Sequence, residues 1–211
     1  TIAYSIDDYP SNANFGDPIE NHYTEDIYVG YRYFETFAKD RVLYPFGFGL
    51  SYTDFEVKTD ASENGGIITV KTAVTNVGEY DGKEVVQVYF EAPQGKLGKP
   101  TRQLIGFEKT KLLKKGDTCI IEIHLNITDM ASYDDSGASG HKNCYVLENG
   151  DYSVYVGTDV RSAKKVLTYA VKETYVTKFC TECLTPTIPF ERLKPNENFK
   201  KVYEPVPQRT Y

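Results

Sequence analysis

The sequence contains no tryptophan, one methionine, three histidines and four cysteines in 211 residues. It also lacks an excess of positive charge, since 24 Lys and Arg against 30 Asp and Glu give a formal net charge of -6. This balance argues against a nucleic-acid partner, because phosphate binding draws on clustered Lys and Arg. No apolar run approaches the roughly 20 residues that span a bilayer, so no membrane partner is expected.

No signal peptide opens the chain. Because Thr1 stands where an initiator Met would be expected, the start is interpreted as a cleavage point or an artificial boundary. The compartment therefore stays open, with the cytoplasm slightly favoured over secretion. The oligomeric state is also open.

A short basic run is the exception to the acidic composition. On strands and turns, such a run is interpreted as a solvated face rather than a binding patch. Its members are Lys96, Lys99, Arg102, Lys109, Lys111, Lys114 and Lys115.

The cysteines do not form a metal-site pattern. Cys180 and Cys183 have metal or redox spacing, but zinc needs four ligands, and no second pair or suitably spaced histidine accompanies them. Two plain thiols are favoured, with a disulfide or structural zinc as alternatives. Cys119 has the register of a core residue. Neither a glycine-rich phosphate loop nor a nucleophile elbow occurs, so no cofactor is expected.

The segment Tyr44–Thr53 is rich in aromatic residues and glycine. Pro45 restricts the backbone, and Gly47 and Gly49 permit turns or close approach. We interpret it as a hinge packed between two bodies of structure. Before it, residues 1–22 are expected to be irregular, and 23–37 to be extended chain covered on both faces.

After this hinge the pattern is that of an all-β domain. Alternating apolar residues predict half-buried strands at 68–74, 84–90, 118–125 and 152–156. Asn149-Gly150 predicts a hairpin, residues 127–133 a short helical turn, and 134–143 a flexible loop. About seven short strands predict an immunoglobulin or fibronectin type III-like antiparallel β-sandwich. Beyond Lys172, prolines exclude regular pairing and favour a tail or linker.

Several motifs, in order, resemble the C-terminal part of glycoside hydrolase family 3 enzymes, the β-glucosidases especially. The resemblance implies a fibronectin type III-like domain with its preceding segment, and implies that the two catalytic domains are almost wholly absent. The motifs are Tyr23–Phe34, Tyr44–Thr53, Thr75–Gly78, Gly82–Tyr89, Leu104–Lys109 and Gly150–Gly157.

In that family the nucleophile is an Asp of the barrel domain and the acid/base a Glu of the α/β domain, and neither motif occurs here. Glu25 is therefore expected to make ordinary hydrogen bonds or ion pairs. No catalytic, binding or metal residue is predicted, and the chain alone is expected to be inactive. The predicted packing residues against the catalytic domains, the expected partners, are Tyr28, Tyr31, Tyr33, Phe46, Phe48 and Tyr52.

The resulting hypothesis is a structural, non-catalytic part of a retaining β-glucosidase that hydrolyses terminal β-linked glucose. Residues 1–52 would be the lead-in from the α/β domain, 53–172 the sandwich and 173–211 the tail. Alternatives are a carbohydrate-binding module, suggested by 18 Tyr and 11 Phe, and a protein-interaction domain. Two domain orders of the parent enzyme fit equally well, one with the barrel domain after the sandwich and one with it before.

Overall fold

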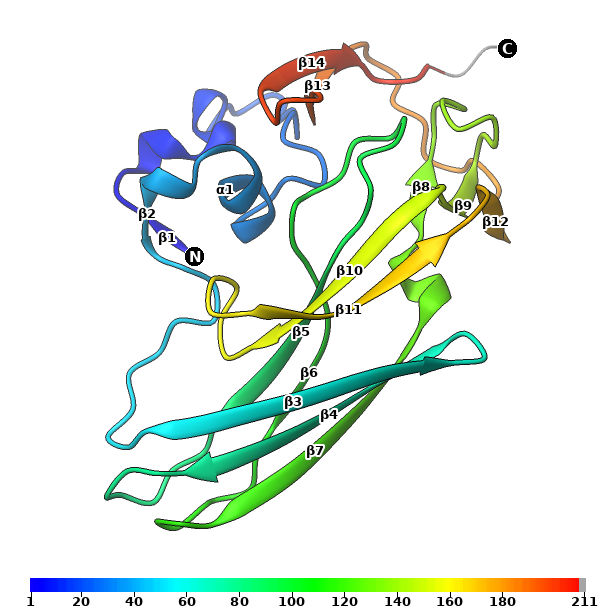
Figure 1. Cartoon of the computed structure of the whole chain (residues 1–211). Coiled ribbons are helices and arrows are strands. Elements are labelled where there is room, and N and C mark those ends of the chain that lie inside the picture. Colours follow the sequence, from blue (N-terminus) through cyan, green and yellow to red (C-terminus); the bar gives the residue numbers. More distant parts are fainter. Residues whose placement is uncertain (209–211) are drawn as a thin grey trace.

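The computed structural model, which describes residues 1–208, confirms the all-β sandwich (Figure 1). Its two antiparallel sheets have the strand orders β11-β10-β5-β6 and β3-β4-β7. Residues 209–211, the end of the expected tail, lie outside the described part. The seven strands are β3 Phe55–Asn64, β4 Ile67–Asn76, β5 Val85–Glu91, β6 Gln103–Lys109, β7 Thr118–Asn126, β10 Gly150–Gly157 and β11 Lys164–Val171.

The main core lies between the two sheets. Strand β4 contributes Val70 and Val74, and β5 contributes Val86 and Val88, all four fully buried. Cys119 is partly buried against this core, as its register predicted. Because side chains alternate across a strand, these positions are the inward set that the sequence pattern predicts.

Strand β5 is buried on both faces. Tyr89 and Gln87 point away from the sandwich core, yet they are 0% and 6% exposed. Tyr31 of the preceding segment lies against Tyr89, with ring centroids 6.1 Å apart. The four-stranded sheet therefore has a second layer above it.

This layer corrects the prediction of an extended chain over residues 23–37, because Tyr31–Phe37 forms helix α1. Gly30, at φ 57°, turns the chain into the helix. Tyr33 and Phe34 are buried in a small second core, and this packing overrides their β propensity. The other elements of this layer are β1 Ile2–Ala3, η1 Ile6–Asp8, η2 Pro10–Ala13, η3 Lys39–Arg41 and β2 Val42–Tyr44. None of the helices within residues 1–208 has the length and apolar character needed to cross a membrane.

A third, smaller sheet has the order β12-β9-β8, from Tyr175–Phe179, Cys144–Leu147 and Ser132–Asp134. It shows that the hairpin predicted at Asn149-Gly150 is wrong. Strand β9 pairs with β8 and β12, whereas β10 pairs with β5 and β11. The Asn149 side chain instead donates to the carbonyl of Val171 at 3.1 Å, so this turn transfers the chain between sheets. The predicted helical turn is η4, Ile127–Met130.

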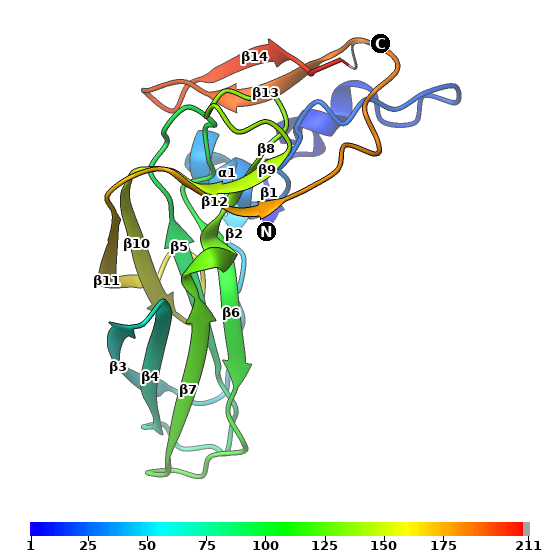
Figure 2. The same cartoon turned by 90° about the vertical axis from the view of Figure 1, so that its right-hand side faces the viewer.

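The tail corrects a further expectation, because β13 Glu191–Pro195 and β14 Lys201–Pro205 pair as a hairpin. Pro195 and Pro205 are each the last residue of a strand, where proline disturbs a ladder least. The hairpin lies above α1 and the third sheet, at the opposite end from the β6–β7 turn (Figure 2). Residues 191–205 of the tail therefore form regular paired strands.

Candidate functional site

The junction between the preceding segment and the sandwich is built from aromatic rings. The Tyr31 ring stacks on Phe46 at 4.7 Å, and its hydroxyl accepts the backbone N–H of Leu104 at 2.8 Å. Gly47 has φ 87°, and a Cβ there would lie 2.6 Å from Nε2 of Gln87. Glycine is thus required where the hinge passes over β5.

Polar contacts reinforce this junction. Nε of Arg161, in the β10–β11 loop, lies 3.0 Å from the buried carboxylate of Glu35, and its NH2 group donates to the carbonyl of Lys39 at 2.7 Å. The Thr101 N–H donates to Thr36 Oγ1 at 3.1 Å, and the Thr101 hydroxyl to the carbonyl of Glu35 at 3.0 Å. The C-terminal half of α1 and the turn that follows it are therefore attached to two loops of the sandwich.

The six predicted packing residues fall into three groups. Tyr28 and Tyr33 are buried inside the chain itself, at 2% and 3% exposure. Tyr31 and Phe46 form the junction just described. Phe48 and Tyr52 alone are exposed, at 48% and 93%.

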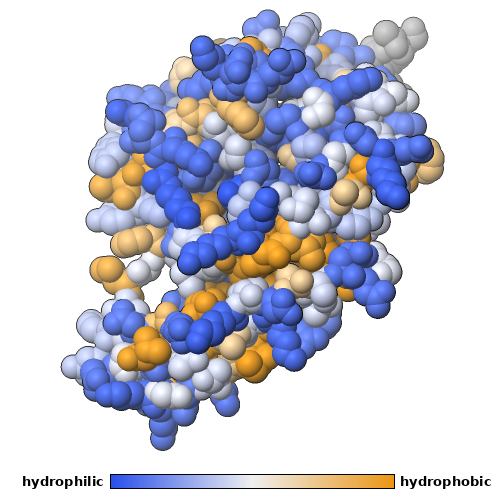
Figure 3. Space-filling view, viewed as in Figure 1, coloured by the Kyte–Doolittle hydropathy of each residue, from blue (hydrophilic) through white to orange (hydrophobic). Residues whose placement is uncertain are grey.

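The exposed pair belongs to a larger apolar surface, which we call the apolar edge: Ile2, Phe48, Leu50 and Tyr52. Leu50 is 92% exposed; its alternation with Phe48 and Tyr52 could have identified it from the sequence. A cavity of about 370 Å³ opens between β1, β2 and the hinge, lined by Ile2, Phe48 and Leu50 among others. Figure 3 shows hydrophobic side chains along the left edge, where the hinge runs in Figure 1.

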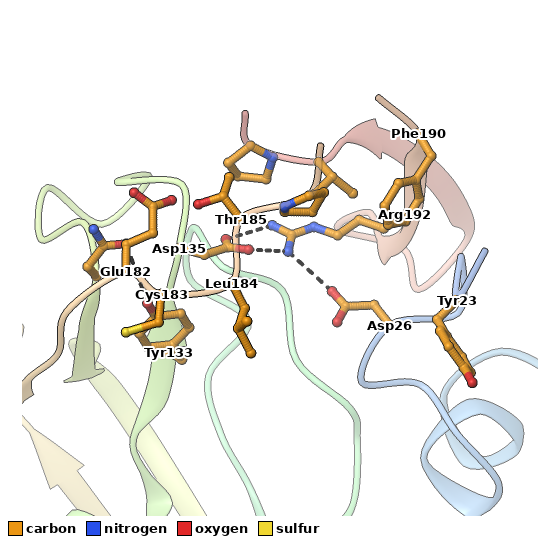
Figure 4. A pocket seen from close by; sticks show the side chains of 14 residues that line it. Tyr23, Asp26, Tyr133, Asp135, Glu182, Cys183, Leu184, Thr185, Phe190 and Arg192 are labelled. Carbon is orange, nitrogen blue, oxygen red and sulfur yellow. Dashed lines mark hydrogen bonds and ion pairs between the residues drawn. The ribbon is translucent and has the colours of Figure 1, made fainter. Parts of the chain in front are cut away.

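Three separate segments meet at Arg192 of β13. Its guanidinium binds both carboxylate oxygens of Asp135, at 2.5 and 2.8 Å, and lies 3.4 Å from Asp26 (Figure 4). It also lies 3.4 Å from Glu204. Burial alone would lower the pKa of Arg192, but Asp135, Asp26 and Glu204 raise it above its ordinary value. Burial raises the pKa of Asp26 despite this cation. A cavity of about 490 Å³ lies beside the cluster, lined also by Tyr23 and Cys183.

A buried ion pair anchors the β5–β6 loop. Lys99 Nζ binds the Glu148 carboxylate, and the two side chains are 1% and 6% exposed. Nζ also donates to the carbonyls of Pro93 at 2.8 Å and Gln94 at 3.2 Å. This corrects the interpretation of the whole basic run as a solvated face. No local pattern marks Lys99, because Glu148 is 49 residues away.

The remaining carboxylates serve local structure. Asp134 is fully buried and accepts backbone N–H groups from Ser136, Gly137, Ala138 and Ser139. The loop predicted to be flexible is therefore closed around this side chain. Burial raises the pKa of Asp134, but hydrogen bonds from the hydroxyls of Ser139 and Ser136 and from the backbone N–H groups of Ser139 and Gly137 outweigh it and hold the pKa below its ordinary value.

Glu25 contradicts the expectation of ordinary hydrogen bonding. Its Oε2 is buried and has no hydrogen-bond partner within residues 1–208.

The four cysteines are free thiols: Cys144 is buried, Cys119 and Cys180 are half-buried and Cys183 is exposed. Within the described residues, no three His, Cys, Asp or Glu side chains gather in a way that could hold a metal ion.

Comparison with known proteins agrees with this architecture. Residues 84–160 match the family model described as "Fibronectin type III-like domain". A β-glucosidase from Ruminococcus albus is 50% identical over 92% of this chain, and β-glucosidase A from Butyrivibrio fibrisolvens is 40% identical over 100%. A β-glucosidase structure from Paenibacillus barengoltzii superimposes with a TM-score of 0.94 at 49% identity, over 100% of the chain.

The fold and the family match define a fibronectin type III-like β-sandwich domain. This chain is such a domain with its preceding segment, of the kind that glycoside hydrolase family 3 β-glucosidases contain. It spans 20% and 28% of the two relatives' lengths and 25% of the solved chain.

Proposed function

We propose that this chain is a non-catalytic structural part of a family 3 β-glucosidase, which packs against the catalytic domains and stabilises them. The parent would hydrolyse terminal β-linked glucose with retention, through two carboxyl groups about 5–5.5 Å apart that the rest of the enzyme supplies. Residues 1–52, 53–172 and 173–211 would be its lead-in, sandwich and tail.

The observation that carries this proposal is the apolar edge. Phe48, Leu50 and Tyr52 are large, exposed side chains at alternate positions of the irregular segment between β2 and β3. Contiguous exposed apolar surface of this kind normally marks a contact. Phe48 is 48% exposed and Leu50 92%, so burying the surface that they still expose would contribute about 2–4 kcal/mol. Since the chain spans at most 28% of the relatives' lengths, the missing catalytic domains are the natural occupant.

The test is the pair of substitutions Phe48→Ser and Leu50→Ser in the full-length parent. We expect the temperature of heat inactivation, followed by hydrolysis of an aryl β-glucoside, to fall. Phe107→Ser, at a 67% exposed position on β6, is the matched control and should change it little. The isolated 211-residue chain should release no nitrophenol from the same substrate. An unchanged inactivation temperature in the double variant, or turnover by the purified chain, would contradict the proposal.

A further inference from the structure

A second cavity, of about 470 Å³, lies among α1, the β5–β6 loop, the third sheet and the tail hairpin. We call it the lateral groove. Its walls include Arg32 of α1, Gln103 of β6, Ser132 and Tyr133 of β8, and Tyr145 of β9. The volume falls within the roughly 300–1,000 Å³ of small-molecule sites. The groove lies next to the cavity beside Arg192, because Asp26, Tyr133, Asp135 and Arg192 line both.

The groove contains polar groups that the fold itself does not use. Among residues 1–208, the Arg32 guanidinium, the Gln103 amide and the Ser132 hydroxyl take part in no hydrogen bond or ion pair. Tyr28 also lines the groove, and its buried hydroxyl has no hydrogen-bond partner in the described part of the chain. A buried polar group such as the Tyr28 hydroxyl normally finds a partner, so this hydroxyl, with the half-buried polar groups beside it, points to a ligand that both donates and accepts hydrogen bonds.

The charges of the groove balance. Three acidic side chains line it, Asp26, Asp135 and Glu204, and three basic ones, Arg32, Arg192 and Lys194. The acids are already bound to Arg192, and Lys194 Nζ lies 3.0 Å from Glu204. Such a site gives no net attraction to an anion or a cation, and a neutral ligand rich in hydroxyl groups suits it best.

Tyrosine rings supply an apolar wall. The Tyr133 and Tyr145 rings lie 5.3 Å apart, and each residue is 39% exposed. An aromatic ring face can pack against the C–H face of a hydroxylated pyranose ring, while the polar side chains around it bind the hydroxyl groups. We propose that the lateral groove is a saccharide-binding site for neutral oligosaccharides. This binding role is additional to the structural role proposed above and does not depend on it.

Isothermal titration of the 211-residue chain with cellotetraose tests the proposal. We expect saturable binding that changes little between low and high salt, because no net charge is neutralised. Tyr145→Ala and Arg32→Gln should each weaken binding at least about tenfold, equivalent to 1.4 kcal/mol. Tyr175→Ala is the matched control: Tyr175 is 42% exposed on the same sheet but lies outside the groove, so binding should be unchanged.

Thermal unfolding of each variant separates lost binding from lost folding, and a variant counts only if its midpoint stays near that of the unsubstituted chain. Where Tyr145→Ala fails this criterion, Tyr145→Leu, which keeps an apolar side chain but removes the ring face, takes its place. Absence of saturable heat with cellotetraose and with mannotetraose would overturn the proposal. Equal affinity in the groove variants and the control would overturn it as well. The apolar-edge substitutions leave the groove intact, so the two proposals can fail independently.

Discussion

Replacing Glu148 by Gln tests whether the Lys99–Glu148 pair anchors the β5–β6 loop. In the native fold, Lys99 Nζ is bound by one carboxylate and by the carbonyls of Pro93 and Gln94. The substitution leaves a buried ammonium group with neutral acceptors only. Burial already lowers the pKa of Lys99, against the opposing effect of Glu148.

Removing one partner of a buried ion pair costs about 3–5 kcal/mol, since the other charge stays buried and uncompensated. Lys99 is 1% exposed, so the full range applies. Domains of this kind have unfolding free energies of about 5–15 kcal/mol, and the loss is a large fraction of that. The loop also contains Thr101, which forms hydrogen bonds with α1. Destabilising the loop should therefore also weaken the junction between α1 and the sandwich.

Urea unfolding followed by far-ultraviolet circular dichroism measures the effect. At slopes of about 1–3 kcal/mol per molar urea, a loss of about 3–5 kcal/mol should lower the urea midpoint of Glu148→Gln by about 1–5 M. The double variant Lys99→Met with Glu148→Gln should recover much of the loss, because no buried charge remains. Glu56→Gln is the control, since its partner Lys58 is 73% exposed. The reasoning would be refuted if the unfolding free energy of Glu148→Gln lay within about 1 kcal/mol of that of the unsubstituted chain. It would also be refuted if the double variant were no more stable than Glu148→Gln.

Two further predictions concern the tail and alkaline pH. Arg192→Met should lower the free energy of unfolding by about 2 kcal/mol, which is below the range for deeply buried pairs because Asp135 is one-third exposed. Limited proteolysis should then cleave the tail faster. Lys115→Met, at an exposed ion pair, is the control and should not change the rate of cleavage. Burial raises the pKa of Tyr89 and Tyr152 above the ordinary value of 10.0. As the pH rises, these tyrosines therefore ionise in the unfolded chain before they ionise in the folded one. The free energy of unfolding should then fall above pH 10, by about 1.4 kcal/mol per tyrosine and pH unit. A urea midpoint that does not fall between pH 10 and 11 would contradict the second prediction.

The sequence predicted the strands of the sandwich well and the preceding segment poorly. Ile121 and Ile123 alternate with polar residues on β7, and both are buried as expected. Tyr31–Phe37 has apolar residues on both strand faces, but the same residues fit a short helix that is buried on most sides. Periodicity over seven residues does not separate these alternatives.

The candidate sites were less predictable still. Aromatic content predicted a contact surface of six residues, of which the fold leaves Phe48 and Tyr52 exposed. The cluster at Arg192 joins residues 57 and 12 positions away, and the walls of the lateral groove come from five separate parts of the chain. No local pattern carries such information.

By itself the sequence determined the β-sandwich, because alternation of side chains across a strand is a local property that one buried face imposes on each segment. Only the tertiary structure decided which charges pair, which tyrosines are covered and where a groove remains. Those outcomes depend on groups that are distant along the chain and meet only after folding.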